Sequence, residues 1–90
     1  MTPTLIECFG IALRQSREAK SWSQEQLAGH SNLNRSYVGE IERGRAIASL
    51  ATVEKLALAL GISPSALVSR GEEVSHSNVV RCIRLMAIAC

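Results

Sequence analysis

The sequence predicts an all-α protein, with five short helices in residues 1–69 and a short apolar C-terminal extension. Apolar residues recur at spacings of three and four along the predicted helices, and no strand-like alternation accompanies them. The two prolines stand where helices begin, and two of the six glycines, Gly44 and Gly61, stand where helices end. Ninety residues suffice for one domain with one small core, and with only three aromatic residues that core must be aliphatic.

The first helix is predicted to begin at Pro3, with Thr2 as its N-cap. Arg14 and Arg17 fall outside its apolar side, where a solvated face is the simplest interpretation. The inward side is a stripe of residues four apart with one more apolar residue beside it: Leu5, Phe9 and Leu13, and Ile6.

Two further helices joined by a tight turn are predicted within residues 24–44, QEQLAGHSNLNRSYVGEIERG. Ser23 and Gln26 have the spacing of a capping box at the start of the first. Asn34 is placed to cap the second helix, and Gly44 to end it. The apolar positions fall where a helix-turn-helix needs its packing contacts: Leu27, Ala28, Leu33, Val38 and Ile41.

The second of these helices carries polar or small residues on its outward side. A helix that packs on its neighbour through one side and leaves the other side free has the geometry by which proteins place a helix in the DNA major groove. The outward positions are Arg35, Ser36, Gly39 and Glu40.

The fourth helix is predicted to run from a Ser49 cap to Leu60, with Gly61 as its stop. A fifth, short helix is predicted to start from a Ser63 cap, with Pro64 as its first residue. Core packing explains the apolar face of the fourth helix, so no cofactor is expected. That face consists of Leu50, Val53, Leu56, Ala57 and Leu60.

Residues 70–78 are polar and without periodicity, and are predicted to link the domain, residues 1–69, to the extension, residues 79–90. The extension, VVRCIRLMAIAC, is too short to span a membrane and too apolar to stay exposed on a soluble monomer. Three interpretations remain open: a sixth helix docked on the domain, a dimerisation element, or a tail without regular structure. A helix or strand at a dimer interface is preferred.

The sequence resembles the Cro/phage-repressor type of helix-turn-helix protein, also called the xenobiotic-response-element family. The matching pieces are FGIALRQSRE, WSQEQLA, LNRSYVGEIERG and LATVEKLALALGISPSALV, between about Pro3 and Val68. Asn32 and Ala48 depart from the family pattern, which often has glycine and proline there. The resemblance implies a five-helix repressor-like DNA-binding domain whose second and third helices form the helix-turn-helix.

The resemblance also implies roles for single residues. An ion pair between Arg17 and Glu42 would tie the first helix to the end of the third. By their positions in the third helix, the residues expected to read bases are Arg35, Ser36 and Glu40, with Gly39 between them. Arg35 is suited to donate two hydrogen bonds to guanine, and Glu40 is suited to accept a hydrogen bond from the N4 amino group of cytosine.

Contacts with the DNA backbone are expected from the start of the second helix, from the third helix and from the segment after it. For Tyr37, packing over the turn is an equal alternative. The expected backbone contacts are Gln24, Tyr37, Arg43 and Arg45.

The charge balance is modest for a DNA-binding protein. Ten Lys and Arg residues stand against eight Glu, and residues 1–74 hold eight of each. DNA binding must then depend on how the charge is distributed, which fits a specific binder better than a nonspecific coating protein.

Composition also excludes several function classes. The chain has no aspartate and no nucleophile with a nearby base, so an enzyme is not expected. No run reaches the roughly 20 apolar residues of a membrane span and no signal sequence opens the chain, so a cytoplasmic protein without membrane association is predicted. No metal site is predicted, because the cysteines and histidines lack ligand spacing: Cys8, Cys82, Cys90, His30 and His76.

These observations predict a sequence-specific DNA-binding transcriptional regulator that acts as a homodimer on a roughly palindromic operator in double-stranded DNA. Two subunits are expected because one recognition helix reads only a few base pairs. The alternative is an antitoxin-like interaction module, whose C-terminal extension binds a partner protein.

Overall fold

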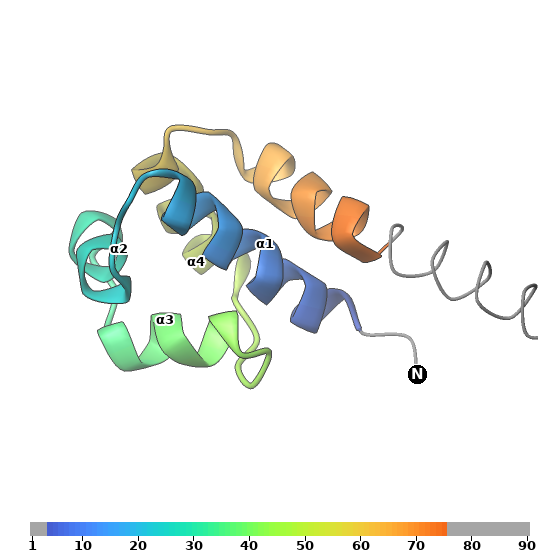
Figure 1. The fold of residues 1–90 in the computed structure, drawn as a ribbon, viewed down its shortest axis with the longest axis horizontal. Helices are drawn as coiled ribbons and strands as arrows, with labels where there is room; N and C mark the ends of the chain where they lie inside the picture. Colours follow the sequence, from blue (N-terminus) through green and yellow to red (C-terminus); the bar gives the residue numbers. More distant parts are fainter. Residues whose placement is uncertain (1–3, 76–90) are drawn as a thin grey trace, which may run out of the picture.

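A computed structural model of the chain describes residues 4–75. Within this range the fold consists of helices and contains no strand (Figure 1). The helices are α1 Leu5–Ala19, α2 Gln24–Ser31, α3 Arg35–Glu42, α4 Leu50–Leu60 and a fifth helix, Pro64–Ser75. The predicted all-α fold of five helices is confirmed. The apolar extension, residues 79–90, lies outside the described residues.

Helix α1 begins later than predicted, because Thr4 and not Thr2 is its N-cap. Thr4 Oγ1 accepts a hydrogen bond from the Glu7 N–H at 3.2 Å, and the Glu7 carboxylate accepts one from the Thr4 N–H at 3.4 Å. This capping box provides hydrogen-bond acceptors for two backbone N–H groups, which favours a helix that starts after Thr4 over one that starts at Pro3. Leu5 was wrongly predicted to face inward: it is 51% exposed, since α1 is buried only from Cys8 onward.

One aliphatic core receives side chains from all five helices. Its largest fully buried members include Leu13, Leu27, Val38, Ile41, Leu56 and Leu67. On α4, four of the five residues predicted to face inward are buried, but Leu50 is 86% exposed. The buried stripe of α4 begins instead at Thr52 and Val53, which leaves Leu50 in the first turn outside the core.

The fifth helix is longer than predicted and docks along α1, beside which it runs in Figure 1. Gly71 is buried, and a Cβ added there would lie 3.1 Å from Phe9 Cα, so the two backbones approach closely. Arg70 Nη1 donates to the buried Ser16 hydroxyl at 2.8 Å. The prediction of a linker is therefore wrong for residues 70–75, which these contacts with α1 hold in the helix. The division into a domain and an extension stays a prediction.

Helix α1 also crosses the end of α3 at very short range. A Cβ added to the buried Gly10 would lie 2.4 Å from the Ile41 carbonyl oxygen and 2.7 Å from that of Glu42. Both distances are too short for a real contact, so the crossing requires a residue without a side chain. This crossing positions α3 on the rest of the fold.

Three further observations concern residues 4–75. Cys8 is completely buried, which is consistent with a small apolar role. In this part of the chain no three His, Cys, Asp or Glu side chains are grouped to hold a metal ion. No single helix there is long and apolar enough to cross a membrane, although α4 and the fifth helix, bent by 97°, meet that test as a pair.

Candidate DNA-binding surface

Local hydrogen bonds set the turn between α2 and α3. Asn32 ends α2 in the left-handed conformation, with φ 56° and ψ 44°, which asparagine adopts more readily than most residues. Asn34 then starts α3, where its Oδ1 accepts from the Ser36 N–H at 2.8 Å. At the start of α2, Ser23 and Gln26 form the predicted capping box. Helices α2 and α3 therefore begin at the N-caps that the sequence predicted, Ser23 and Asn34.

Helix α3 is held on its inner side and free at its start. Val38 and Ile41 are buried at 0% and 1% exposure, and they pack into the core with Leu27 of α2. Arg35 and Ser36, in the first turn of α3, are exposed. In a helix-turn-helix protein, the first turn of this helix enters the major groove. In this chain that turn is open to a partner.

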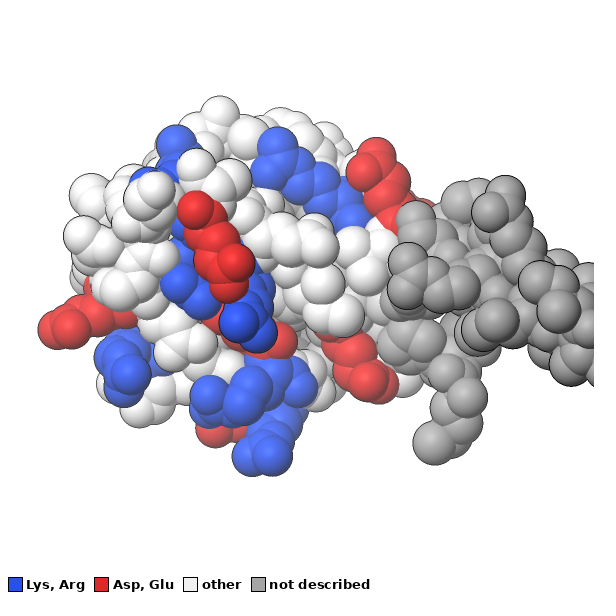
Figure 2. All heavy atoms as spheres, in the orientation of Figure 1, with Lys and Arg blue, Asp and Glu red and all other residues white. Residues whose placement is uncertain are grey.

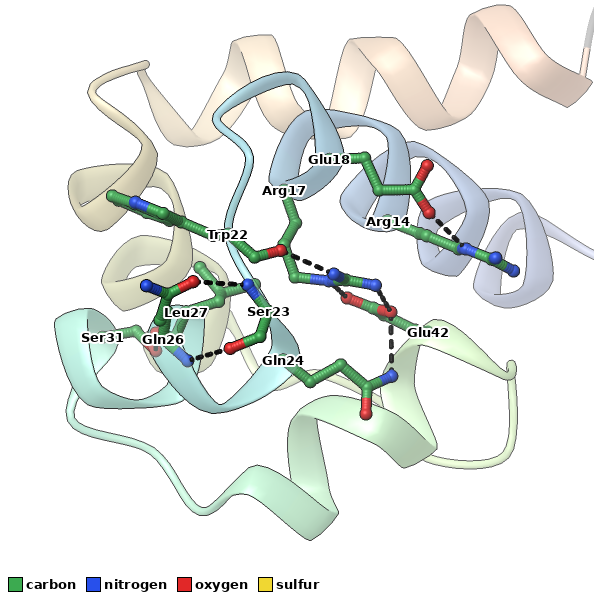
Figure 3. Close-up of polar contacts among 10 residues, drawn as sticks. All are labelled: Arg14, Arg17, Glu18, Trp22, Ser23, Gln24, Gln26, Leu27, Ser31 and Glu42. Atoms are coloured by element: carbon green, nitrogen blue, oxygen red, sulfur yellow. Dashed lines mark hydrogen bonds and ion pairs between the residues drawn. The ribbon is translucent and has the colours of Figure 1, made fainter.

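A buried ion pair joins α1 to the end of α3 (Figure 3). Arg17 Nε donates to Glu42 Oε2 at 2.7 Å, and Arg17 Nη2 donates to Glu42 Oε1 at 3.0 Å. The Arg17 side chain is 12% exposed and the Glu42 side chain 3%. The hydrogen bond to Glu42 raises the pKa of Arg17, against the smaller opposing effect of burial. The structure thus brings together the two residues that the resemblance paired.

Two groups extend this pair into a network. Gln24 Nε2 donates to Glu42 Oε1 at 3.1 Å, and Arg17 Nη1 donates to the Trp22 carbonyl oxygen at 2.7 Å. The Gln24 amide, an expected DNA-backbone contact, is thereby oriented between the start of α2 and the end of α3. Neither contact is evident from the sequence, because a backbone carbonyl and a residue in another helix leave no local pattern.

Gly39 does not face outward as predicted. It is buried, and a Cβ added there would lie 3.3 Å from Gln24 Oε1 and 3.3 Å from the guanidinium nitrogens of Arg43. The side chains of Gln24 and Arg43 therefore cover Gly39, because the start of α2 crosses α3 at this point. A glycine here lets both polar groups lie flat on α3.

Glu40 and Arg43, expected to contact a base and the DNA backbone, pair with each other. Arg43 Nη2 and Glu40 Oε1 lie 2.8 Å apart, and the two side chains are 49% and 41% exposed. An exposed pair of this kind contributes less than about 0.5 kcal/mol, so DNA can replace it with little loss. Arg45, in the loop after α3, is exposed.

The Tyr37 hydroxyl is engaged inside the fold. It donates to the Ile47 carbonyl oxygen at 3.1 Å and lies 3.4 Å from Thr52 Oγ1. Tyr37 thus joins α3 to the following loop and to α4. These contacts favour the packing interpretation of Tyr37 over a phosphate contact.

Positive charge gathers on the side of the molecule that α3 occupies. Figure 2 shows Lys and Arg side chains at the lower edge, where α3 and the loop after it lie in Figure 1. The exposed basic residues of this segment are Arg35, Arg43 and Arg45. A surface of this kind attracts phosphate even though the chain has a net charge of only +2.

Known proteins share this arrangement. Residues 13–67 match the family model HTH_3, helix-turn-helix. The control protein C.BamHI of Bacillus amyloliquefaciens is 44% identical over 69 residues, which are 76% of this chain and 85% of that protein.

Solved structures of two restriction-modification controller proteins are also similar. C.AhdI of Aeromonas hydrophila has a TM-score of 0.68 and 52% identity, over 69% of this chain and 94% of that one. C.Esp1396I, solved as a tetramer in complex with its natural 35 base-pair operator, has a TM-score of 0.73 and 25% identity. That match covers 81% of this chain and 96% of C.Esp1396I.

Proposed function

This chain belongs to the helix-turn-helix family HTH_3, of the Cro/phage-repressor type that its sequence resembles, and we propose that it is a sequence-specific transcriptional regulator. It acts in the cytoplasm as a homodimer on a roughly palindromic operator. The observation that carries the proposal is the exposed first turn of α3, with Arg35 and Ser36, on a helix whose inner side is buried. Such a helix is rigidly presented, and rigid presentation is what base reading requires.

The roles of the polar residues follow from where they lie. Arg35, Ser36 and Glu40 read bases. Gln24, Arg43 and Arg45 contact phosphates and set the position of α3 in the groove. The similarity to controller proteins, one of them solved in complex with its operator, supports DNA binding by a chain of this fold.

A homodimer is proposed because a single recognition helix of eight residues, Arg35–Glu42, reaches only a few base pairs. Two helices related by a twofold axis would read two half-sites about one helical turn apart, roughly 34 Å, on one face of the duplex. The operator should therefore be an inverted repeat.

The test is a pulldown of genomic fragments with the purified chain, followed by footprinting of the enriched fragments. Enriched fragments are expected to share an inverted repeat whose half-sites are about 10 base pairs apart, centre to centre. Enrichment without a shared sequence would contradict specific regulation. A single asymmetric site would contradict the homodimer.

Replacing Arg35 by alanine is expected to weaken operator binding by about 1–3 kcal/mol and to relax the preference at one base position. The reason is the exposed place of Arg35 in the first turn of α3. Fluorescence anisotropy titrations against matched and mismatched operators measure both effects.

The control is Arg14→Ala, which removes the same charge from a side chain that is 67% exposed on α1. It should leave operator discrimination unchanged. If Arg35→Ala weakened binding equally on matched and mismatched DNA, Arg35 would contact phosphate instead of a base.

A second candidate function, an antitoxin-like interaction module, is favoured by the apolar side chains left exposed on the described fold, such as Leu50 and Ile47. Size exclusion with light scattering separates the two candidates. A discrete dimer supports the regulator, whereas a protein that aggregates until a partner is added supports the interaction module.

A further inference from the structure

An apolar groove lies between the start of α1, the loop after α3, the start of α4 and the fifth helix. Its walls include Leu5, Ile6, Ile47, Leu50, Val53 and Val68, and its volume is about 200 Å³. We call it the Leu50 groove. None of the residues that we assign to DNA contact lies in its wall.

The side chains around the Leu50 groove are unusually exposed for their type: Leu5 at 51%, Ile6 at 38%, Ile47 at 72% and Leu50 at 86%. Single exposed apolar side chains are ordinary on a protein surface. A cluster of them around a hollow is typical of an interaction site.

Acidic side chains border the groove. An adjoining hollow shares Leu50, Val53 and Val68 with it and is lined also by Glu54 and Glu72. Both glutamates are exposed. A segment that fills the groove is therefore expected to be apolar and to carry positive charge.

Residues 79–90 of this chain, VVRCIRLMAIAC, have this chemistry. Ten of the twelve residues are apolar, and the other two are Arg81 and Arg84. The segment also starts close by, because the last residue that the structure describes is Ser75 of the fifth helix, and the end of that helix nearest Ser75 runs beside the start of α1, which forms one wall of the groove (Figure 1).

We propose that the Leu50 groove of each subunit binds residues 79–90 of a second copy of the chain. Arg81 and Arg84 then lie near the Glu54 and Glu72 of the subunit that receives them. This rests on the proposed homodimer and names the surface that forms it.

Two reasons favour residues 79–90 of a second copy, and not those of the same chain, as the segment that fills the groove. Only residues 76–78 separate Ser75 from residue 79, a reach of at most about 14 Å, and such short connections favour exchange over folding back. A segment that leaves the fold beside its own groove can also cross a twofold axis to the equivalent groove. The two reciprocal contacts then close the dimer.

The first test uses the full chain with Leu50→Ser, measured by sedimentation equilibrium. The dimer should dissociate at least tenfold more readily than the wild type. Leu58→Ser is the matched control, because Leu58 is 80% exposed on the same helix but does not line the groove. It should leave the dimer unchanged, and circular dichroism checks that both variants stay folded.

A charge exchange tests the occupant. Arg81→Glu with Arg84→Glu should weaken the dimer, and adding Glu54→Arg with Glu72→Arg should restore it. Oxidation of Leu50→Cys, with native Cys82, distinguishes the two chains: a disulfide-linked dimer supports exchange between copies, whereas an internally linked monomer overturns it. Leu58→Cys is the control for random cross-linking.

The outcomes separate this inference from the proposed function. A wild-type dimer that Leu50→Ser does not weaken overturns the groove contact and leaves the homodimeric regulator intact. A wild-type chain that is a monomer, both free and on its operator, overturns the homodimer and the groove contact together.

Discussion

Replacing Arg17 by alanine is expected to lower the free energy of unfolding by about 3 kcal/mol or more. The change leaves the Glu42 carboxylate, whose side chain is 3% exposed, with the Gln24 amide as its remaining hydrogen-bond donor. A buried charge that loses its counterion is among the most destabilising single changes. Urea unfolding of the variant beside the wild type measures the loss.

Glu42→Ala should also destabilise the fold, by a smaller amount. The Arg17 side chain that it leaves behind is more exposed than Glu42, at 12%, and keeps its hydrogen bond to the Trp22 carbonyl oxygen. In a double-mutant cycle the combined variant should lose less stability than the sum of the single changes. Strictly additive losses would mean that the two side chains do not interact in solution.

The control for this cycle is the Arg14–Glu18 pair on α1. Its shortest N–O distance, 2.7 Å, equals that of the Arg17–Glu42 pair, but its side chains are 67% and 54% exposed. Arg14→Ala should change the free energy of unfolding by less than about 0.5 kcal/mol. Burial, not distance, accounts for the expected difference between the two arginines.

Replacing Gly10 by alanine is expected to cost about 2 kcal/mol or more of stability. The new Cβ would lie 2.4 Å from the Ile41 carbonyl oxygen and 2.7 Å from that of Glu42, so backbone must move. This loss should exceed the roughly 1 kcal/mol that alanine gains over glycine in a helix. Because the end of α3 must shift, operator affinity should fall as well.

Gly29→Ala is the matched control for Gly10→Ala. Gly29 is also helical, in α2, and an added Cβ has no neighbour within 4 Å. Thermal melts should show Gly29→Ala to be neutral or stabilising, by up to about 1 kcal/mol. If the two alanine variants had equal stability, α1 and α3 would not cross as closely as described.

The sequence could predict the helix-turn-helix because its determinants are local. Ser23, Gln26 and Asn34 lie within three residues of the N–H groups that they cap, so their spacing alone indicates where α2 and α3 begin. The apolar spacing of Val38 and Ile41 likewise predicts the buried side of α3. Arg17 and Glu42 were paired only through the family resemblance, since no local pattern connects residues so far apart.

Periodicity predicted less at the edges of the fold. Leu5 and Leu50 continue an apolar stripe but stand in first turns that extend past the core, so both are exposed. Gly39 has the spacing of an outward position, yet α2 crosses over it. A helical period gives the direction of a side chain and not what stands in front of it.

The sequence by itself thus determined the helices up to the start of the fifth, the N-caps of every helix after the first, the aliphatic core and the family. Only the tertiary structure decided that the fifth helix continues to Ser75, that Gly10 must be glycine, that Gln24 joins the Arg17–Glu42 pair and that an apolar groove stays open. The physical reason is the range of the interactions. Caps and turns depend on neighbours within a few residues, whereas close crossings, buried charges and grooves depend on residues that meet only after the helices have packed.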